Sequence, residues 1–412
     1  MRHIIVIGGG FAGLWSAVSA VRRLEELGQS ARVTLINLTP HHSIRVRNYE
    51  EDLTDTLVDL ASVLDPIGVN LVVGRVTEID VAAHELVMID ESGRRETLGY
   101  DKLVLASGSQ LVRPTIPGEE HIFDIDTHTA ACRLQAHLDD LVQTAPSAGR
   151  FTALVVGSGA TGVEIATELP KRLKALAVQA GHDPAAVRII LADRQARIAN
   201  GLGGGQPVIE RACIDLGIEL LPNCAVVSAD AQGVTLANGD RIEASTIIWC
   251  GGMRADVLTQ TIPVPRDQVG RLFVDAYMRV QGAKDVYAAG DTAQALIDGR
   301  RPSVMSCQHA RPMGRYAGTN AVNALFGQVL LPLTIDWYTN IVDLGAWGAV
   351  YTQGWDRVVV AEGHEAKRTK MSINRERIYP PTDGDREKII EAGATTLQAP
   401  PSLKPLSTLE NL

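Results

Sequence analysis

The chain contains short runs of apolar, mostly β-branched residues that lead into glycines and then into a helical pattern. Residues 4–7 (Ile-Ile-Val-Ile) precede Gly8, Gly10 and Gly13. A run without polar alternation is typical of a parallel strand that is buried on both faces. Small and apolar residues at 14–27 continue as a helix. The segment therefore predicts a buried strand, a tight turn and a helix N-terminus.

The spacing of the glycines, Gly-x-Gly-x-x-Gly, gives each of them a separate use. Gly8 allows the turn, Gly10 lets the backbone approach a pyrophosphate, and Gly13 lets the helix pack close to the strand. Phe11 and Ala12 stand at the start of the helix, where free amides and the helix dipole favour a phosphate. We expect dinucleotide binding here; the alternative is a glycine-rich turn without a ligand.

The same pattern returns later in the chain. Residues 153–156 lead into Gly157, Gly159 and Gly162, followed by a second helical pattern in which Pro170 predicts a break. Two such units in one chain carry more weight than a single glycine motif.

Each unit has a second strand whose last residue faces the expected ribose position. The strand at 32–37 ends in Asn37, where an acid is usual, and the strand at 188–193 ends in Asp193. An amide can still bond a ribose hydroxyl, but without charge assistance.

The remaining pattern predicts further elements. Helices are expected at 48–65, 208–216 and 311–326. Strands are expected at 70–73, 102–105, 218–221, 225–229, 233–236, 246–249 and 285–288, with an antiparallel meander at 75–98. The aromatic-rich stretch 333–379 predicts strands, as a small core, a pocket wall or a dimer interface, and the proline-rich tail from Pro380 predicts loose packing.

Composition excludes some function classes. The 412 residues, 45% of them hydrophobic, allow two or three domains, and the net charge of −9 disfavours nucleic acid as a partner. We expect no signal peptide, because the first strand starts at residue 3, and no membrane span, because no apolar run reaches 18 residues. Five scattered cysteines predict no disulfide framework, which makes the cytoplasm the default location, and no histidines have zinc spacing.

Two further motifs complete a recognisable order. Leu-Ala-Ser-Gly-Ser stands at 105–109 and Ala-Ala-Gly-Asp at 288–291, between and after the glycine loops. This order resembles the flavoproteins with two dinucleotide-binding domains, the pyridine nucleotide-disulfide oxidoreductase superfamily. Residues 159–164, 247–252 and 308–310 are most similar to type II NADH dehydrogenases.

The resemblance implies an α/β fold with two Rossmann-like domains. An FAD-binding domain would comprise residues 1–115 and 255–330, an inserted NAD(P)H-binding domain residues 116–254, and a small C-terminal α+β region residues 331–412. The implied cofactor-binding residues are Gly8, Gly10, Phe11, Ala12, Gly13, Asn37, Ser107, Gly108, Gly157, Gly159, Gly162, Asp193, Gly251, Gly290 and Asp291. Asp193 favours NADH because its charge repels a 2′-phosphate, while Arg194 and Arg197 leave NADPH open.

The resemblance also implies catalytic candidates. Glu164 would lie near the flavin and nicotinamide rings; its alternative is a buried carboxylate that braces its helix. Gln308 and His309 would meet the electron acceptor, with His309 as a proton donor or as a satisfied buried histidine. The helix that begins near 308–312 would point its N-terminus at the flavin.

Three departures separate the chain from parts of this superfamily. Residues 38–60 contain no cysteine, so a disulfide relay is excluded there, and Cys132 and Cys307 either face a flavin or are inert thiols. Pro312 replaces the second glutamine that quinone-binding members commonly carry. The tail is polar, whereas those members end in amphipathic membrane-associating helices.

The sequence therefore predicts an enzyme that takes hydride from NADH onto FAD and passes electrons to a quinone-like acceptor, without a redox disulfide or a metal. One alternative is a soluble NAD(P)H-dependent flavin oxidoreductase or oxidase with another acceptor or a redox-protein partner. A second is a non-catalytic NAD(P)H-sensing flavoprotein. Peripheral membrane contact and a homodimer stay open.

Overall fold

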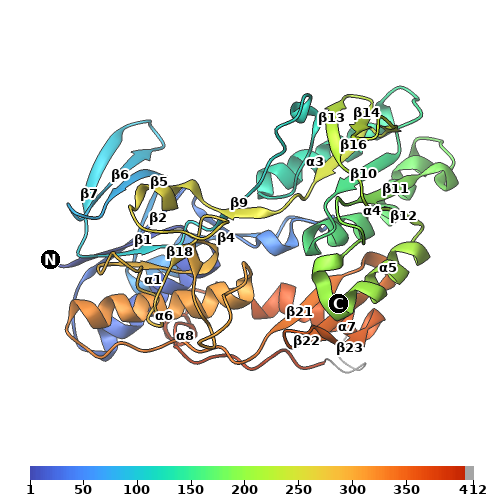
Figure 1. Ribbon diagram of the computed structural model, residues 1–412. Coiled ribbons are helices and arrows are strands. Elements are labelled where there is room, and N and C mark those ends of the chain that lie inside the picture. The colour runs from blue at the N-terminus through green and yellow to red at the C-terminus, as the bar shows by residue number, and fades with distance from the viewer. Residues whose placement is uncertain (404–412) are drawn as a thin grey trace.

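The computed structural model describes residues 1–403. Two sheets built on parallel strands, one in each half of Figure 1, are joined by the C-terminal part of the chain, which runs beneath both. The first sheet has the strand order β19 (Val286–Ala288), β8 (Lys102–Leu105), β1 (His3–Ile7), β2 (Arg32–Asn37), β5 (Asn70–Asp80), β6 (Glu85–Asp90) and β7 (Arg95–Gly99). The second has the order β12 (Ile218–Leu221), β11 (Arg188–Ala192), β10 (Thr152–Val156) and β16 (Thr246–Trp249).

Each glycine loop follows the strand that lies inside its sheet. In the first sheet β1 runs parallel to both β2 and β8, with Ile5 opposite Thr34 and Leu103. In the second, β10 takes the same place between β11 and β16. Both β1 and β10 are buried along their whole length, as their uninterrupted apolar runs predict. Each loop therefore lies at the edge of its own sheet that is formed by the carboxyl ends of the parallel strands.

Smaller sheets and eight α-helices complete the part that the structure describes. The helices are α1 (Phe11–Glu26), α2 (Leu60–Leu64), α3 (His128–Asp140), α4 (Ala160–Gln179), α5 (Gln206–Asp215), α6 (Cys307–Leu325), α7 (Gly363–Ser372) and α8 (Arg386–Ala392). The remaining strands are β3 (His41–Ser43), β4 (Leu57–Asp59), β9 (Ser109–Leu111), β13 (Val226–Asp230), β14 (Gly233–Leu236), β15 (Arg241–Glu243), β17 (Met253–Ala255), β18 (Leu272–Phe273), β20 (Ala293–Gln294), β21 (Thr339–Asp343), β22 (Ala349–Gln353) and β23 (Val358–Glu362).

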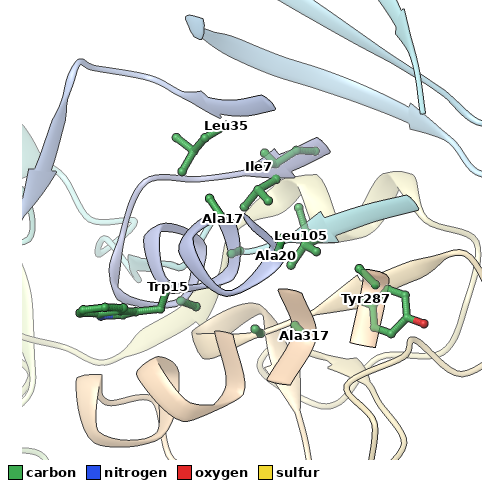
Figure 2. Packing of buried hydrophobic residues seen from close by; sticks show 14 of the residues in the cluster. Ile7, Trp15, Ala17, Ala20, Leu35, Leu105, Tyr287 and Ala317 are labelled. Atoms are coloured by element: carbon green, nitrogen blue, oxygen red, sulfur yellow. The ribbon is translucent and has the colours of Figure 1, made fainter. Parts of the chain in front are cut away.

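Helix α6 packs directly on α1, and this contact carries the C-terminal part of the chain to the first glycine loop. A Cβ at Gly314 would lie 2.1 Å from the carbonyl oxygen of Ala12, and one at Gly318 would lie 2.0 Å from that of Ser16. Only glycine allows this approach, because contacts under 3 Å to backbone force the helices apart. Figure 2 shows α1 between residues of the sheet and Ala317 of α6.

Two helix predictions are wrong. Within 48–65 only α2 is an α-helix, since the carboxylate of Asp52 accepts hydrogen bonds from the amide and hydroxyl of Thr54 and competes with helical bonding. Pro170 does not break α4, which stays continuous because residues on both sides of it, such as Ala166 and Leu173, are buried in the core. Helix α6 begins at Cys307, four residues before the helix expected at 311–326, with Ser306 as its cap.

The C-terminal predictions need correction as well. Residues 333–379 form strands only as far as Glu362, and α7 follows, because Ala366, Thr369 and Lys370 are buried at helical spacing. The tail is not loose throughout. Helix α8 buries Ile389 completely, and the hydroxyl of Ser19 donates to the carbonyl of Gly393 at 2.7 Å. Residues 404–412 of the predicted loose tail lie outside the described residues.

Candidate functional site

The first glycine loop is closed where strand and helix meet and open in the middle. Gly8 has a φ of +102°, and a Cβ there would lie 2.3 Å from the carbonyl oxygen of Ala106. A Cβ at Gly13 would lie 1.7 Å from the carbonyl oxygen of Gly8. Gly10 has no atom within 4 Å of its Cβ position. A ligand can therefore reach the backbone at Gly10, at the N-terminus of α1, as a pyrophosphate requires.

The second loop repeats this geometry. Gly157 has a φ of +107°, and a Cβ there would lie 2.4 Å from the carbonyl oxygen of Cys250. A Cβ at Gly162 would lie 1.8 Å from the carbonyl oxygen of Gly157. Gly159 is open, with no atom within 4 Å of its Cβ position. The residues of both loops thus fit the pyrophosphate of a dinucleotide.

The residue at the end of the second strand holds the loop in each unit. Asn37 Oδ1 accepts the amide hydrogen of Gly9 at 2.8 Å. Asp193 Oδ2 accepts both the amide and the hydroxyl of Ser158, at 2.7 and 2.6 Å. Burial would raise the pKa of Asp193, but these hydrogen bonds hold the pKa below its usual value. The glycine motif by itself does not single out Ser158 for this role.

The Gly-Asp motif lies beside the first loop. A Cβ at Gly290 would lie 2.9 Å from the Cβ of Ala12, so the turn packs on the start of α1. Asp291 Oδ2 accepts the hydroxyl of Ser109 at 2.6 Å, and burial raises the pKa of this carboxyl. The hydroxyl of Ser107 is buried without a partner among residues 1–403, which leaves it free to bond a ligand.

The predicted cofactor-binding set also contains Gly108 and Gly251. Gly108 has a φ of +79° and open space at its Cβ position. At Gly251 a Cβ would lie 2.2 Å from Nε1 of Trp249, so this glycine makes room for the indole.

A cavity of about 470 Å³ connects the two halves of the molecule. One side comes from the second loop and the start of α4, from Gly159 to Glu164. Others come from Arg45 and Val46 of the first half and from the start of α6, including Cys307 and Gln308. The C-terminal part closes it with residues 337–341 and with Lys370, Ile373, Asn374, Arg377, Ile378, Leu397, Gln398 and Pro401. Trp337 and Tyr338 belong to this wall, while Tyr351 is fully buried in its own small sheet.

Glu164 lies at this cavity in an ion pair. Lys370 Nζ is 2.7 Å from Glu164 Oε1, which also accepts the amide hydrogen of Asp343 at 3.2 Å. Burial raises the pKa of Glu164 even though Lys370 opposes the shift. Burial alone would lower the pKa of Lys370, but the neighbouring carboxylate raises it. The ion pair links α4 to α7 across this wall of the cavity.

The structure brings Gln308, but not His309, to the cavity. Gln308 Oε1 accepts the hydroxyl of Thr339 at 3.2 Å, and its Nε2 is buried without a partner within the described chain. His309 is fully buried behind the wall, where its Nδ1 accepts the amide hydrogen of Val304 at 2.8 Å. Burial lowers the pKa of His309 to about 4, so the ring is neutral at pH 7.

Packing accounts for Cys132 and His42, whereas Cys307 lines the cavity. All five cysteines are free. Burial raises the pKa of Cys307, and Cys132 Sγ lies 3.6 Å from His128 Nδ1, away from the cavity. His42 is fully buried, and its Nδ1 donates to the carbonyl of Gly9 at 2.9 Å. Residues 1–403 contain no cluster of three acidic, histidine or cysteine side chains that could hold a metal.

Comparison with known families decides the class of protein. The model of the pyridine nucleotide-disulphide oxidoreductase family matches residues 2–314. The chain belongs to this family. It is therefore an oxidoreductase that uses a pyridine nucleotide, with FAD and NADH as the supported cofactors.

Individual relatives and solved structures show which members of the family the chain is similar to. An NADH dehydrogenase-like protein of Mycobacterium tuberculosis is 47% identical over 406 residues, which cover 97% of this chain and 100% of the relative. A type II NADH:quinone oxidoreductase of Staphylococcus saprophyticus is 25% identical, over 79% of this chain and 83% of its own. In fold, the chain resembles NDH2 of Plasmodium falciparum, solved with NADH, with a TM-score of 0.78, 14% identity and coverage of 95% and 97%.

No helix among residues 1–403 has the length and apolar character needed to span a membrane.

Proposed function

We propose that the protein is an NADH dehydrogenase of the type II kind, which oxidises NADH and reduces a quinone-like acceptor. One observation carries the proposal: a single cavity extends from the second glycine loop to the start of α6, and both Glu164 and Gln308 line it. Such a cavity allows the nicotinamide and the electron acceptor to reach the same cofactor ring, and its protein walls exclude water.

The two units divide the binding of the dinucleotides. FAD is assigned to the first unit, formed by residues 1–115 and 255–330, with its pyrophosphate at Gly10 and its ribityl chain at Asp291. NADH is assigned to the inserted unit, residues 116–254, with its pyrophosphate at Gly159 and its adenosine ribose at Asp193. The open space at both middle glycines supports a pyrophosphate in each unit.

The overall reaction is NADH + H⁺ + quinone → NAD⁺ + hydroquinone. FAD, when bound, supplies a ring that accepts hydride and returns two electrons. The chain itself orients the partners. The start of α6 presents its free amides and the positive end of its dipole to negative charge at the cavity. Gln308 Nε2, which is buried without a partner in the described part of the chain, is placed to donate a hydrogen bond to an acceptor carbonyl.

Relatives that reduce quinones support the acceptor class. Their names include the type II NADH:quinone oxidoreductase of Staphylococcus saprophyticus and the demethylphylloquinone reductase of Synechocystis, each 25% identical to this chain. The cavity volume of about 470 Å³ is typical of sites for small molecules, and aromatic side chains such as Trp337 and Tyr338 form part of its wall.

Anaerobic stopped-flow measurements of the flavin-loaded protein test the proposal. Reduction by NADH and reoxidation by a soluble naphthoquinone are followed as separate steps. We expect fast reduction by NADH, slower reduction by NADPH, and reoxidation by the quinone that greatly exceeds reoxidation by oxygen. Fast reduction followed by reoxidation no faster with the quinone than with oxygen would overturn the assignment of the acceptor.

The variant Gln308→Leu provides the matched control within the site. Loss of the amide donor should slow reoxidation by the quinone about tenfold, because a hydrogen bond made at the acceptor carbonyl is lost. Reduction by NADH should stay unchanged. Equal slowing of both steps would instead show that Gln308 maintains the structure of the site and does not act on the acceptor.

A further inference from the structure

The wall of the cavity carries far more positive than negative charge. Among the described residues that line it, Glu164 provides the carboxylate, and it is already paired with Lys370. Five arginines also line it: Arg45, Arg311, Arg315, Arg357 and Arg377. Of these, Arg45 forms an ion pair, with Asp126. A neutral quinone gives no reason for the remaining positive charge.

Arg315 is the least satisfied of these arginines. Its side chain is 6% exposed and lies over the ring of Trp15, with 4.7 Å from Cζ to the ring centroid. Its Nε is buried without a hydrogen-bond partner, and no ion pair to it exists within residues 1–403. An arginine this deeply buried normally has a carboxylate or another anion beside it, because a lone buried charge is costly.

Arg311 reinforces the same charge one helical turn earlier. It is 7% exposed and also lies near the ring of Trp15, with Cζ 5.1 Å from the ring centroid. Its hydrogen bonds go to neutral oxygens, the carbonyl of Arg377 at 2.8 Å and Oε1 of Gln398 at 3.4 Å. Burial, together with the charge of Arg315, lowers the pKa of Arg311 to about 10, so both groups are still cations at pH 7.

The glycine loop to which the pyrophosphate of FAD is assigned is not part of the wall that carries these cations. Residues 8–13, where a dinucleotide pyrophosphate fits the first unit, are absent from the described lining of the cavity. The dinucleotide of the second unit meets the cavity at Gly159, Ala160 and Thr161, on a different wall from α6. The two arginines line the cavity together with Gln308 and Gln398, and Arg311 donates a hydrogen bond to Gln398.

We infer that the cavity takes an electron acceptor that bears an anionic group, of the carboxylate, sulfonate or phosphate class, and that Arg315 and Arg311 bind this group. The inference rests on the proposed function and narrows its acceptor. Two parallel N–H donors of a guanidinium match the oxygens of such a group, and the low-polarity surroundings of Trp15 strengthen the interaction. The reducible ring of the same molecule would then lie near Gln308.

A binding experiment tests the anion site without catalysis. Naphthalene-2-sulfonate and the neutral 2-naphthol are titrated into the flavin-loaded full-length protein by calorimetry. We expect the sulfonate to bind more tightly than the naphthol, and Arg315→Gln to weaken sulfonate binding about tenfold or more while it changes naphthol binding less than about twofold. Arg315→Lys, which keeps the charge, should retain most of the preference. Arg375→Gln removes an exposed arginine of the same C-terminal segment as Arg377 and should change neither affinity.

A kinetic experiment ties the site to the acceptor. The NADH-reduced protein is reoxidised with 1,4-naphthoquinone-2-sulfonate and with 1,4-naphthoquinone. Arg315→Gln should lower the rate constant for the sulfonated quinone about tenfold relative to the unsubstituted one, with flavin reduction by NADH unchanged. Comparing each quinone with itself between variant and wild type removes the difference in their reduction potentials.

The outcomes separate the inference from the function on which it rests. Sulfonate binding that Arg315→Gln leaves unchanged, or an equal loss for both quinones, would overturn the inference. A loss confined to reduction by NADH would overturn it as well, because the guanidinium would then serve the nicotinamide dinucleotide. Wild-type protein that neither quinone reoxidises would overturn the proposed function instead, whatever the calorimetry shows.

Discussion

Lys370 Nζ lies 2.7 Å from Glu164 Oε1, although 206 positions separate the two residues in the chain. Glu164 stands on α4 of the inserted unit, and Lys370 on α7 of the C-terminal region. Both side chains are nearly inaccessible to solvent except at the cavity that they line. One ion pair thus fixes the C-terminal region against the unit to which NADH is assigned.

Removal of one partner should therefore destabilise the protein strongly. Lys370→Met leaves the carboxylate of Glu164 buried and unpaired, and we expect the free energy of unfolding to fall by about 3–5 kcal/mol. The double variant Glu164→Gln, Lys370→Met removes both charges and should recover a large part of this loss. Urea denaturation of the two single variants and the double variant measures the coupling. Additive losses would show that the pair does not act as a unit.

The sequence correctly predicts the elements that are determined by the local pattern of apolar residues and glycines. The apolar runs at 4–7 and 153–156 with their glycines correctly place the strands and turns of both units and the starts of their helices, since each element forms from neighbouring residues. The same holds for the meander of β5, β6 and β7. These elements and the turns between them contain every glycine of the two loops, so the residue pattern alone locates the backbone of both candidate dinucleotide sites.

The walls of the cavity do not follow from local pattern. Lys370, Arg315 and residues 397–401 meet only through tertiary packing, and no motif spacing marks them. The helix α7 lies in a stretch whose aromatic residues favour strands, and its helical burial pattern rests on the polar residues Thr369 and Lys370. The motif places His309 at the acceptor beside Gln308, but successive helical residues face different directions, and the ring of His309 is buried behind the wall.

Acid should destabilise the protein through two buried histidines. Burial lowers the pKa of both His42 and His309 to about 4, while the unfolded chain has the ordinary value near 6.5. Between these values the unfolded state binds more protons, so stability falls as the pH falls from about 6.5 to about 4 and is fully present above 6.5. Each histidine contributes up to about 1.4 kcal/mol per pH unit within this window.

Denaturation by urea at pH 7.0 and pH 5.0 checks this dependence. His42→Asn keeps a donor for the carbonyl of Gly9 and removes the titration, so the loss of stability between the two pH values should shrink. His364→Asn, at an exposed position, should leave it unchanged. An identical pH dependence in wild type and His42→Asn would contradict a neutral buried ring.

The charge at Asp193 should set the preference between NADH and NADPH. Asp193→Asn removes the carboxylate that we expect to repel a 2′-phosphate. Its amide oxygen can keep the hydrogen bonds from Ser158, whereas the one from the amide of Gln195 is lost. We expect the second-order rate constant of flavin reduction by NADH to fall about tenfold, since a charge-assisted hydrogen bond to the ribose is lost. The constant for NADPH should fall less or rise.

Ser158→Ala is the matched control for this change. It removes the hydroxyl bonded to Asp193 but leaves the carboxylate and the amide bond of Ser158. Both rate constants should then change in proportion, so that their ratio stays constant. A ratio that Asp193→Asn does not alter would contradict the assignment of this carboxylate to the adenosine ribose.

The two open glycines allow the binding of each dinucleotide to be tested separately. Gly10 has a φ of −76° and Gly159 a φ of −67°, which alanine also adopts, and neither has an atom within 4 Å of its Cβ position. Alanine should therefore leave the fold intact at both positions and block only the approach of a pyrophosphate. Gly10→Ala should lose FAD on gel filtration, while Gly159→Ala should keep FAD and bind NADH about tenfold more weakly.

Gly13→Ala, whose Cβ would lie 1.7 Å from a backbone oxygen, should not fold and marks the difference between the two kinds of glycine. If Gly159→Ala instead released FAD, the assignment of FAD and NADH to the two units would have to be reversed.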